Sequence, residues 1–465
     1  MLELLEQEDI RVPKNDLFKV GVILKAEEIL ILQEIFIHST MRATSIHGLY
    51  EMFSKGKRSA TGISNRIRKL VDSGMLVQIK EPLGNGDSLS GLTYYHYRLG
   101  PRGLEVLITL GKVEKEKGER AIHSAIRRGV PSSHFRATSN LANKIVIRML
   151  SHSPTIDFTH IRGSIHEELG ATNDTVFSQR GLIIPDWVFE REDTIIAIEV
   201  DTGTQRREII RRKYKRYEKM AKLLLAKGKR LFVIFAVTDG SIIDISVGQD
   251  LRRDTRSRRV VSLKETFPIF TEWPENLEIS VATARRIPLL VERILNKLAP
   301  ISKSEQLLYL ETWEELMESY KPKHHELVLE SIKVAEEKGL TLKRSRDMDA
   351  TFLMDHKING ISASHYLMLF GEEGNVRTFQ IIRNNVQLAK YLNHNPKITL
   401  DFRVFILYYF KGEALEDVYG LDLDECSLYL SNIETMEWKE DGTESIDYHL
   451  KMTTPYRRKE VKLFV

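Results

Sequence analysis

The sequence contains a single cysteine, Cys426, and no long apolar run. One thiol excludes an intrachain disulfide and a cysteine-rich zinc site, and it fits a reducing compartment. The longest apolar stretches, such as residues 231–237, are far too short to cross a bilayer. The first residues lack the basic and apolar segments of a secretory signal. These absences predict a cytoplasmic protein with no membrane partner.

Fixed-period repeats and low-complexity tracts are lacking too, which argues against a solenoid. Overall charge says little, because 69 basic and 65 acidic residues leave a formal net charge of +4. Apolar material is plentiful, at 42% of 465 residues, and suits a chain of several domains. We expect an α/β and α+β multidomain protein with an N-terminal domain (17–110), a charged connector (111–133), a central α/β domain (134–298) and a C-terminal α+β accessory domain (299–465).

The N-terminal domain is predicted to be a winged helix-turn-helix. Apolar spacing predicts helices over 26–39, 44–53 and 59–74. Ser59 or Thr61 is the expected N-cap of the third helix, and Gly74 its end. After Gly74 the apolar period changes to two, on both sides of a tip rich in Gly, Asn, Asp and Ser. That pattern predicts a two-stranded wing.

The third predicted helix has the composition of a helix that reads the DNA major groove. Its apolar face carries Ile63, Ile67, Leu70 and Val71, which leaves the polar side chains outside. Arg and Asn make bidentate contacts to guanine and adenine, and Lys binds phosphates. The predicted DNA-contacting residues of this helix are Asn65, Arg66, Arg68 and Lys69. The alternative is a winged helix that contacts only protein, with these side chains simply solvated.

The central domain has the pattern of a compact α/β unit. The predicted elements are a helix at 141–150, strands at 156–165, 181–191 and 193–204, a long helix at 207–228, and an apolar strand at 230–237. The strands at 181–191 and 193–204 are separated by a tight charged turn and predict a hairpin. The C-terminal domain is predicted to mix helices at 304–320 and 324–339 with strands at 398–410 and 445–454.

Three carboxylates are expected to converge on the central hairpin. Alternation along one strand places Glu199 and Asp201 on the same face, and Asp186 lies in the neighbouring strand. Burying an uncompensated carboxylate is costly, so such a group predicts a strong cationic partner or a metal ion. Oxygen ligands of this kind suit Mg²⁺ or Mn²⁺. The predicted metal ligands are therefore Asp186, Glu199 and Asp201.

The order Pro185-Asp186 and then Glu199-Val200-Asp201, with these helices and strands, resembles the PD-(D/E)XK nuclease superfamily. More narrowly, residues 185–205 and the following helix with Lys213 and Tyr217 are similar to the replication-relaxation family of bacterial plasmids and mobile elements. The resemblance covers about the first 300 residues. It implies a winged helix ahead of a PD-(D/E)XK-like α/β domain, here with a mixed sheet, and it makes Asp186 and Glu199 the metal ligands.

One position departs from the superfamily pattern. Its members carry a lysine two residues after the glutamate, which orients or activates the attacking water, and here that residue is Asp201. Gln205 could position the water instead. So could Lys213, which shares a helix face with Ile209 and Tyr217. Alternatively, Lys213 only neutralises Asp201 or lies along apolar surface. The candidate catalytic residues are Asp186, Glu199, Asp201, Gln205 and Lys213.

Basic residues cluster near the carboxylates in two segments, 206–219 and 251–261. Such density predicts contacts with a phosphate backbone, and the alternative is a charged surface without a ligand. The residues predicted to bind DNA here are Arg206, Arg207, Arg211, Arg212, Arg252 and Arg253. His134 has no second metal ligand at a recognisable spacing, so it is expected to be a capping or surface residue.

These patterns favour a protein that binds double-stranded DNA and nicks or cleaves it with Mg²⁺ or Mn²⁺ in replication or maintenance of a plasmid or mobile element. The alternative is a non-catalytic, sequence-specific DNA-binding regulator of replication or copy number with a degenerate nuclease fold. A third hypothesis is a scaffold whose C-terminal domain recruits replication or mobility proteins. The sequence leaves open the DNA site, a homo-oligomeric state and the function of residues 299–465.

Overall fold

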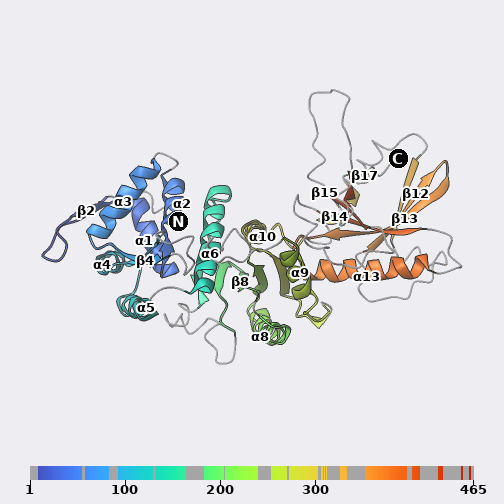
Figure 1. The fold of residues 1–465 in the computed structure, drawn as a ribbon. Coiled ribbons are helices and arrows are strands. Elements are labelled where there is room, and N and C mark those ends of the chain that lie inside the picture. The colour runs from blue at the N-terminus through green and yellow to red at the C-terminus, as the bar shows by residue number, and fades with distance from the viewer. Residues whose placement is uncertain are drawn as a thin grey trace, which may run out of the picture. The chain divides into compact units, whose positions relative to one another are not determined.

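The structure is a computed structural model that places the chain's elements in two compact units (Figure 1). It describes residues 9–54, 58–82, 93–128, 132–163, 183–203, 205–238, 253–269, 272–301, 305–306, 308, 310–311, 325–331, 351–394, 401–408, 428–432, 452–453 and 460–461. The first unit is Met1–Arg252 with Pro274–Glu278 and Thr283–Asn296. The second is Arg253–Trp273 with Ile279–Ala282 and Lys297–Val465.

The first unit begins with short strands and helices that pack around one core. A strand pair, β1 (Ile10–Val12) and β2 (Val22–Leu24), precedes the helices α1 (Ala26–His38), α2 (Ala43–Phe53) and α3 (Ala60–Asp72). A three-stranded antiparallel sheet has the order β3-β5-β4, from β3 (Met41–Arg42), β4 (Leu76–Pro82) and β5 (Thr93–Leu99). Helices α4 (Pro101–Thr109) and α5 (Lys115–Arg128) follow.

The three predicted N-terminal helices are confirmed to within two residues at each end. The Ser59 hydroxyl accepts a hydrogen bond from Gly62 N at 3.2 Å, which satisfies one unpaired amide at the start of α3. Gly74 ends the segment with φ +75°, a conformation that favours glycine. Both predicted strands beside the tip form, as β4 and β5, while the tip itself lies outside the described residues.

A mixed sheet of order β10-β9-β8-β7-β6 follows, and its strands β6 to β9 lie in the first unit. Its strands are β6 (Thr159–Arg162), β7 (Trp187–Arg191), β8 (Thr194–Asp201), β9 (Arg230–Val237) and β10 (Leu277–Thr283). β7 is antiparallel to β6 and β8, whereas β8 and β9 are parallel. Hydrogen bonds from Leu231 N to Asn276 O and from Ala284 N to Val237 O align β10 parallel to β9. The mixed sheet predicted for this region is therefore confirmed.

Helices cover the sheet on both faces. α6 (Ser133–His152) packs against β8 and along α10 (Ile287–Leu295), and α8 (Arg207–Leu225) packs against β9. Figure 1 shows α8 and α10 on opposite sides of the sheet. Every residue of β8 is consequently buried. This explains why the strand is apolar except where it carries Thr194, Glu199 and Asp201.

The predicted strand at 181–191 is shorter in the structure. β7 begins only at Trp187, so Asp186 lies just before the strand and not within it. Pro185 has no backbone N–H to donate to a ladder, which accounts for the late start. Residues 181–182 lie outside the described residues. The following strand and helix form close to their predicted bounds, and β9 matches its predicted range.

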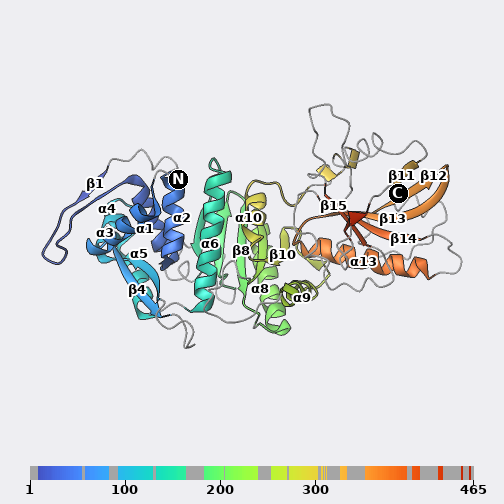
Figure 2. The same cartoon turned by 45° about the horizontal axis from the view of Figure 1, so that its top comes forward.

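The second unit contains a mixed sheet of order β11-β12-β13-β14-β15 and the helices α9 (Arg253–Lys264) and α13 (Val376–Asn393). The strands are β11 (His325–Ser331), β12 (Thr351–Ile358), β13 (Ile361–Gly371), β14 (Phe402–Tyr408) and β15 (Leu428–Asn432). β13 and β14 are parallel and joined through α13, which packs on both (Figure 2). The strands β16 (Met452–Thr453) and β17 (Glu460–Val461) form a two-stranded sheet of their own.

One predicted helix of this region is wrong. Residues 325–331 form β11, paired along its whole length with β12, whereas the sequence predicted a helix over 324–339. Backbone pairing with a strand distant in sequence outweighs the helix propensity of its Leu and Glu residues. The strand predicted at 398–410 is confirmed as β14. Much of the helix predicted at 304–320, and of the strand predicted at 445–454, lies outside the described residues.

No helix in the described ranges is long and apolar enough to span a bilayer.

Candidate functional site

Two of the predicted carboxylates lie where four elements of the first unit meet. Glu199 is near the end of β8, Asp186 immediately precedes β7, and Lys213 and Tyr217 lie on α8 one turn apart. His134, in the first turn of α6, completes the group. We call these five residues the carboxylate assembly.

Every carboxylate oxygen of Asp186 and Glu199 has a partner. Lys213 Nζ donates to Glu199 Oε2 at 2.5 Å, and the Tyr217 hydroxyl donates to Oε1 at 2.6 Å. Val200 N donates to Asp186 Oδ2 at 2.8 Å. His134 Nε2 lies 3.0 Å from Asp186 Oδ1. The assembly is thus a connected polar network around two acids.

Asp186 perturbs Glu199 electrostatically. Burial, and then repulsion by Asp186, raise the pKa of Glu199 to about 7, against the opposing effects of Lys213 and Tyr217. The hydrogen bond to Asp186 raises the pKa of His134 above its ordinary value. Burial, and then the Glu199 charge, raise the pKa of Tyr217. A shifted acid beside a lysine in a polar network is a common feature of functional sites.

The helix face that carries Lys213 differs from the predicted one. The residues of α8 that are buried against the sheet are Ile210, Tyr214, Tyr217, Met220, Ala221 and Leu224. Ile209, predicted on the apolar stripe, is 36% exposed. Lys213 is half-buried beside this stripe and reaches the sheet with its ammonium group, so its predicted reach to the carboxylates is confirmed. Its catalytic role stays a prediction.

Asp201 and Gln205 frame the loop between β8 and α8. Asp201 is buried, and Gln205 is half-buried. Across the part of the chain that the structure describes, Asp186, Glu199 and Asp201 do not form a group with ligand atoms all within 4.8 Å of one another. As placed, the three predicted ligands therefore do not surround one ion.

The segment that carries Asp186 passes very close to Gly163. A Cβ atom added at Gly163 would lie 1.8 Å from the Pro185 carbonyl oxygen, so no side chain fits there without moving the backbone. Gly163 N also donates to Asp186 O at 3.4 Å. This contact helps to position Asp186 beside β8.

His134 is a residue that the sequence interpretation missed. Ser132 is the N-cap of α6, because its hydroxyl accepts from Phe135 N at 3.2 Å. His134 instead contacts Asp186 across 52 residues of sequence. His134 does not cap the helix, and although its side chain is 41% exposed at the surface, no local spacing pointed to its contact with Asp186.

A second polar group, the histidine cluster, consists of Glu34 and His38 of α1 and His160 of β6. All three residues are buried, and one ligand atom from each lies within 4.8 Å of the others. Such a group could hold a metal ion. The Glu-x-x-x-His spacing on α1 was visible in the sequence, but the partner strand lies too far along the chain to be recognised.

Contacts within the histidine cluster are specific. His160 Nε2 lies 3.2 Å from Glu34 Oε1, and His38 Nε2 lies 3.7 Å from Glu34 Oε2. His38 Nδ1 lies 2.7 Å from the Ser139 hydroxyl. Burial, and then the charges of His160 and Arg162, lower the pKa of His38 well below its ordinary value.

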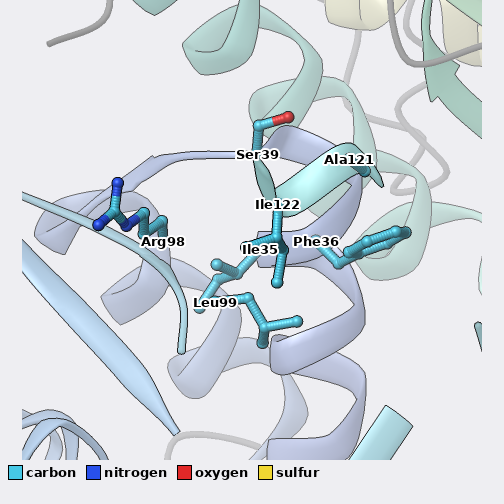
Figure 3. A pocket seen from close by; sticks show the side chains of 7 residues that line it. All are labelled: Ile35, Phe36, Ser39, Arg98, Leu99, Ala121 and Ile122. Carbon is cyan, nitrogen blue, oxygen red and sulfur yellow. The ribbon is translucent and has the colours of Figure 1, made fainter. Parts of the chain in front are cut away.

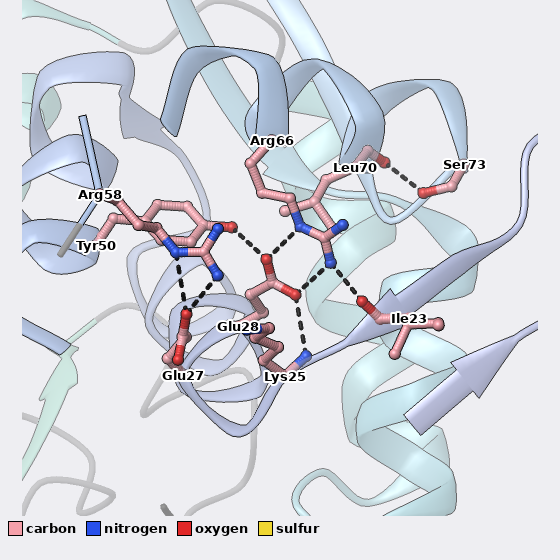
Figure 4. Close-up of polar contacts among 9 residues, drawn as sticks. All are labelled: Ile23, Lys25, Glu27, Glu28, Tyr50, Arg58, Arg66, Leu70 and Ser73. Atoms are coloured by element: carbon pink, nitrogen blue, oxygen red, sulfur yellow. Dashed lines mark hydrogen bonds and ion pairs between the residues drawn. The ribbon is translucent and has the colours of Figure 1, made fainter. Parts of the chain in front are cut away.

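The polar face of α3 is only partly as predicted. Asn65, Arg68 and Lys69 are exposed, and Arg68 donates to Asn65 Oδ1 at 3.1 Å. Arg66, predicted to point outward, is paired with the buried Glu28 and also donates to Ile23 O (Figure 4). Its guanidinium therefore holds α3 against α1.

The remaining predicted DNA contacts are placed unevenly. The side chains of Arg206, Arg207, Arg211 and Arg212 are exposed at the start of α8. Arg252 lies outside the described residues, and Arg253 is the first residue of α9 in the second unit. A separate small hollow, lined mainly by apolar side chains such as Ile35, Leu99 and Ile122, contains none of the residues of either polar group (Figure 3).

The first unit has a mixed α/β fold in which a helical region precedes the strands β6 to β9. Residues 36–232 match the model of a family described as Replication-relaxation. The family resemblance inferred from the sequence is thereby confirmed. No curated protein and no solved structure matches the chain.

Proposed function

We propose that the protein binds double-stranded DNA and nicks or cleaves it during replication or maintenance of a plasmid or mobile element. The match of residues 36–232 to the Replication-relaxation family suggests a role in plasmid replication. In this proposal, α1–α3 with β4 and β5 form a winged helix-turn-helix, and the β6–β10 region is a PD-(D/E)XK-like domain. The element order and the antiparallel β4–β5 pair support the first identity, and the mixed sheet supports the second.

The observation that carries this proposal is the contact between Lys213 and Glu199 beside Asp186. An acid, a second acid and a lysine come together from three separate elements, although the usual lysine position on the strand holds Asp201. The mutual repulsion of the acids is the kind of strain that a divalent cation relieves. The Lys213 ammonium lies where it could take over the role of the missing strand lysine.

The donor set fits a hard ion, because Asp186 and Glu199 offer carboxylate oxygens. Mg²⁺ or Mn²⁺ held by these residues would polarise a phosphate and lower the pKa of water. In this scheme Lys213 orients the attacking water or stabilises charge on the phosphate. Tyr217 holds the Glu199 carboxylate, and His134 holds Asp186 through its hydrogen bond.

DNA would be bound by two exposed basic faces of the first unit. Asn65, Arg68 and Lys69 on α3 provide base and phosphate contacts, while Arg206, Arg207, Arg211 and Arg212 on α8 provide phosphate contacts. Arg66 serves this face indirectly, by fixing α3. We expect Arg68→Ala to weaken DNA binding about tenfold and to reduce its salt dependence by about one phosphate contact.

The test is cleavage of supercoiled plasmid with Mg²⁺ or Mn²⁺. We expect wild type to relax the plasmid, and Glu199→Gln, Asp186→Asn and Lys213→Met to lose this activity while retaining DNA binding in a gel shift. Lys215→Met, which removes an exposed lysine from the same helix, is the matched control and should keep full activity. Equal cleavage by wild type and Glu199→Gln would reject the assembly as the catalytic centre.

A second candidate is a non-catalytic DNA-binding regulator of replication or copy number. It is favoured by the full set of partners on the Asp186 and Glu199 oxygens, which a metal ion would have to displace in part. Its signature is a gel shift without cleavage by any variant, with binding still reduced in Arg68→Ala.

A further inference from the structure

The histidine cluster has spacings that suit a four-coordinate metal ion. Zinc binds histidine nitrogen and carboxylate oxygen at about 2.0–2.2 Å, so neighbouring ligand atoms in a tetrahedral site lie roughly 3.3 Å apart. The observed separations from Glu34 oxygens are 3.2 Å to His160 Nε2 and 3.7 Å to His38 Nε2. These two distances involve different oxygens of one carboxylate, which a small rotation can bring to a common centre.

The hydrogen bonds around His38 determine which of its nitrogens carries the proton. The Ser139 hydroxyl donates to Thr40 O at 3.3 Å, so its proton is already used. In the tautomer that fits this arrangement, His38 Nδ1 donates its N–H to Ser139 Oγ, 2.7 Å away. A neutral His38 consequently presents the lone pair of Nε2 toward Glu34. A histidine that binds a metal through one ring nitrogen typically donates the N–H of its other ring nitrogen to an oxygen in this way.

Two acceptor atoms therefore face each other in the protein interior. Glu34 Oε2 and His38 Nε2 are both buried, and neither has a hydrogen-bond partner among the described residues. Buried polar atoms are normally satisfied, so a pair of opposed acceptors favours a metal cation or a shared proton between them. The surroundings are closed, because the Trp187 ring packs 4.6 Å from the His38 ring and 6.1 Å from the His160 ring.

We propose that Glu34, His38 and His160 bind a structural zinc ion that fastens α1 to β6. Two imidazoles and one carboxylate suit zinc and disfavour magnesium, which prefers oxygen ligands. The three residues are at most 7% exposed, which leaves no path for a substrate. The role is therefore structural, and it is independent of the proposed nuclease centre.

A zinc ion here would join the helical region to the sheet region of the first unit. α1 belongs to the N-terminal helical core, and β6 is the edge strand of the mixed sheet. The bound ion would link residues 126 positions apart in sequence. It would thereby hold the α3 face at a constant distance from the carboxylate assembly.

The test begins with the full-length wild type purified without chelators. Elemental analysis should find about one zinc per chain, and Co²⁺ added to chelator-treated protein should give the visible absorption of a tetrahedral site. His160→Gln should abolish both signals. Ser139→Ala, which removes only the orienting hydroxyl, should weaken metal affinity about 10- to 100-fold. Chelation should lower the melting temperature of wild type.

Two controls separate this site from its alternatives. His152→Gln removes an exposed histidine of α6 and should keep the zinc, as should Asp186→Asn in the carboxylate assembly. The Co²⁺ spectrum of wild type keeps the test decisive even if His160→Gln fails to fold. Wild type that contains no zinc and gives no Co²⁺ absorption would overturn the proposal, whatever the outcome of the nuclease assay.

Discussion

Two buried glutamates of the first unit have similar partners and different surroundings. Glu28 accepts hydrogen bonds from the Tyr50 hydroxyl, the Arg66 guanidinium and Lys25 N (Figure 4). Glu199 accepts from Tyr217 and from Lys213. Both side chains are almost fully buried, each with a tyrosine and a cation from a neighbouring helix.

The difference lies in the charge around each acid. Both Glu28 oxygens are bound by the fork of Arg66, and the backbone donor at the start of α1 adds a further hydrogen bond. Glu199 has one ammonium group beside it, and burial, followed by the charge of a second acid, Asp186, raises its pKa. A buried carboxylate whose charge is balanced by a bidentate arginine stabilises the fold. A buried carboxylate that faces a second acid still has unbalanced negative charge, which an added cation can neutralise.

The largest expected effect is loss of the compensated pair. Glu28→Gln leaves the Arg66 guanidinium without its counter-charge and should reduce the free energy of unfolding by about 3–5 kcal/mol. Glu27→Gln breaks a partly exposed pair with Arg58 and should cost about 1 kcal/mol or less. Urea unfolding measures both. Equal losses in the two variants would show that Glu28 is no more structural than a surface acid.

The second largest expected effect is a dependence of the free energy of unfolding on pH, which arises from Glu199. Between its ordinary pKa near 4.5 and its folded pKa of about 7, the folded state keeps a proton that the unfolded chain has released. Stability should therefore fall as pH rises through this window, by on the order of 3 kcal/mol, since one pKa unit corresponds to about 1.4 kcal/mol.

Glu199→Gln tests this sign directly. The variant should become more stable relative to wild type as pH rises from 5 to 8 in metal-free buffer. Urea unfolding at several pH values provides the measurement. Parallel stability curves for the two proteins would contradict the raised pKa and would remove the contrast with Glu28.

The smallest effect comes from removing one hydroxyl at each acid. Tyr50→Phe and Tyr217→Phe should each cost about 1.5 kcal/mol, because each deletes a hydrogen bond to a buried carboxylate. Tyr217→Phe should also move the pH window of Glu199 upward, since the Tyr217 hydrogen bond lowers the pKa of that acid. The same pH series of unfolding curves reports this shift, and an unchanged window would argue against the contact.

Regular elements with strong local signals were predictable from the sequence. The cap at Ser59, the stop at Gly74 and the apolar alternation of β8 and β9 all act within a few residues, so their patterns can be read locally. β11 was mistaken for a helix because its strand character depends on pairing with β12. Such pairing leaves little trace in the segment itself.

The polar groups were only partly predictable. Glu199 was found because its strand position follows from local alternation, whereas Lys213 was found although it lies beside the buried face of α8 and not on it. Arg66 was assigned to solvent because its partner, Glu28, lies 38 residues earlier on another helix. The contact of His134 with Asp186, and that of His160 with α1, depend on tertiary packing in the same way. The periodicity of a segment alone cannot identify the tertiary partner of one of its side chains.

The close approach of Gly163 to Pro185 has a consequence for how this region can vary. Its hydrogen atom stands where any methyl group would overlap a carbonyl oxygen. Even alanine, the smallest replacement, would push the chain outward just before β7 and carry Asp186 away from Val200 N. Gly163 has no chemical role, yet it is as hard to replace as the acids nearby. Only glycine leaves the space that the Pro185 carbonyl oxygen occupies.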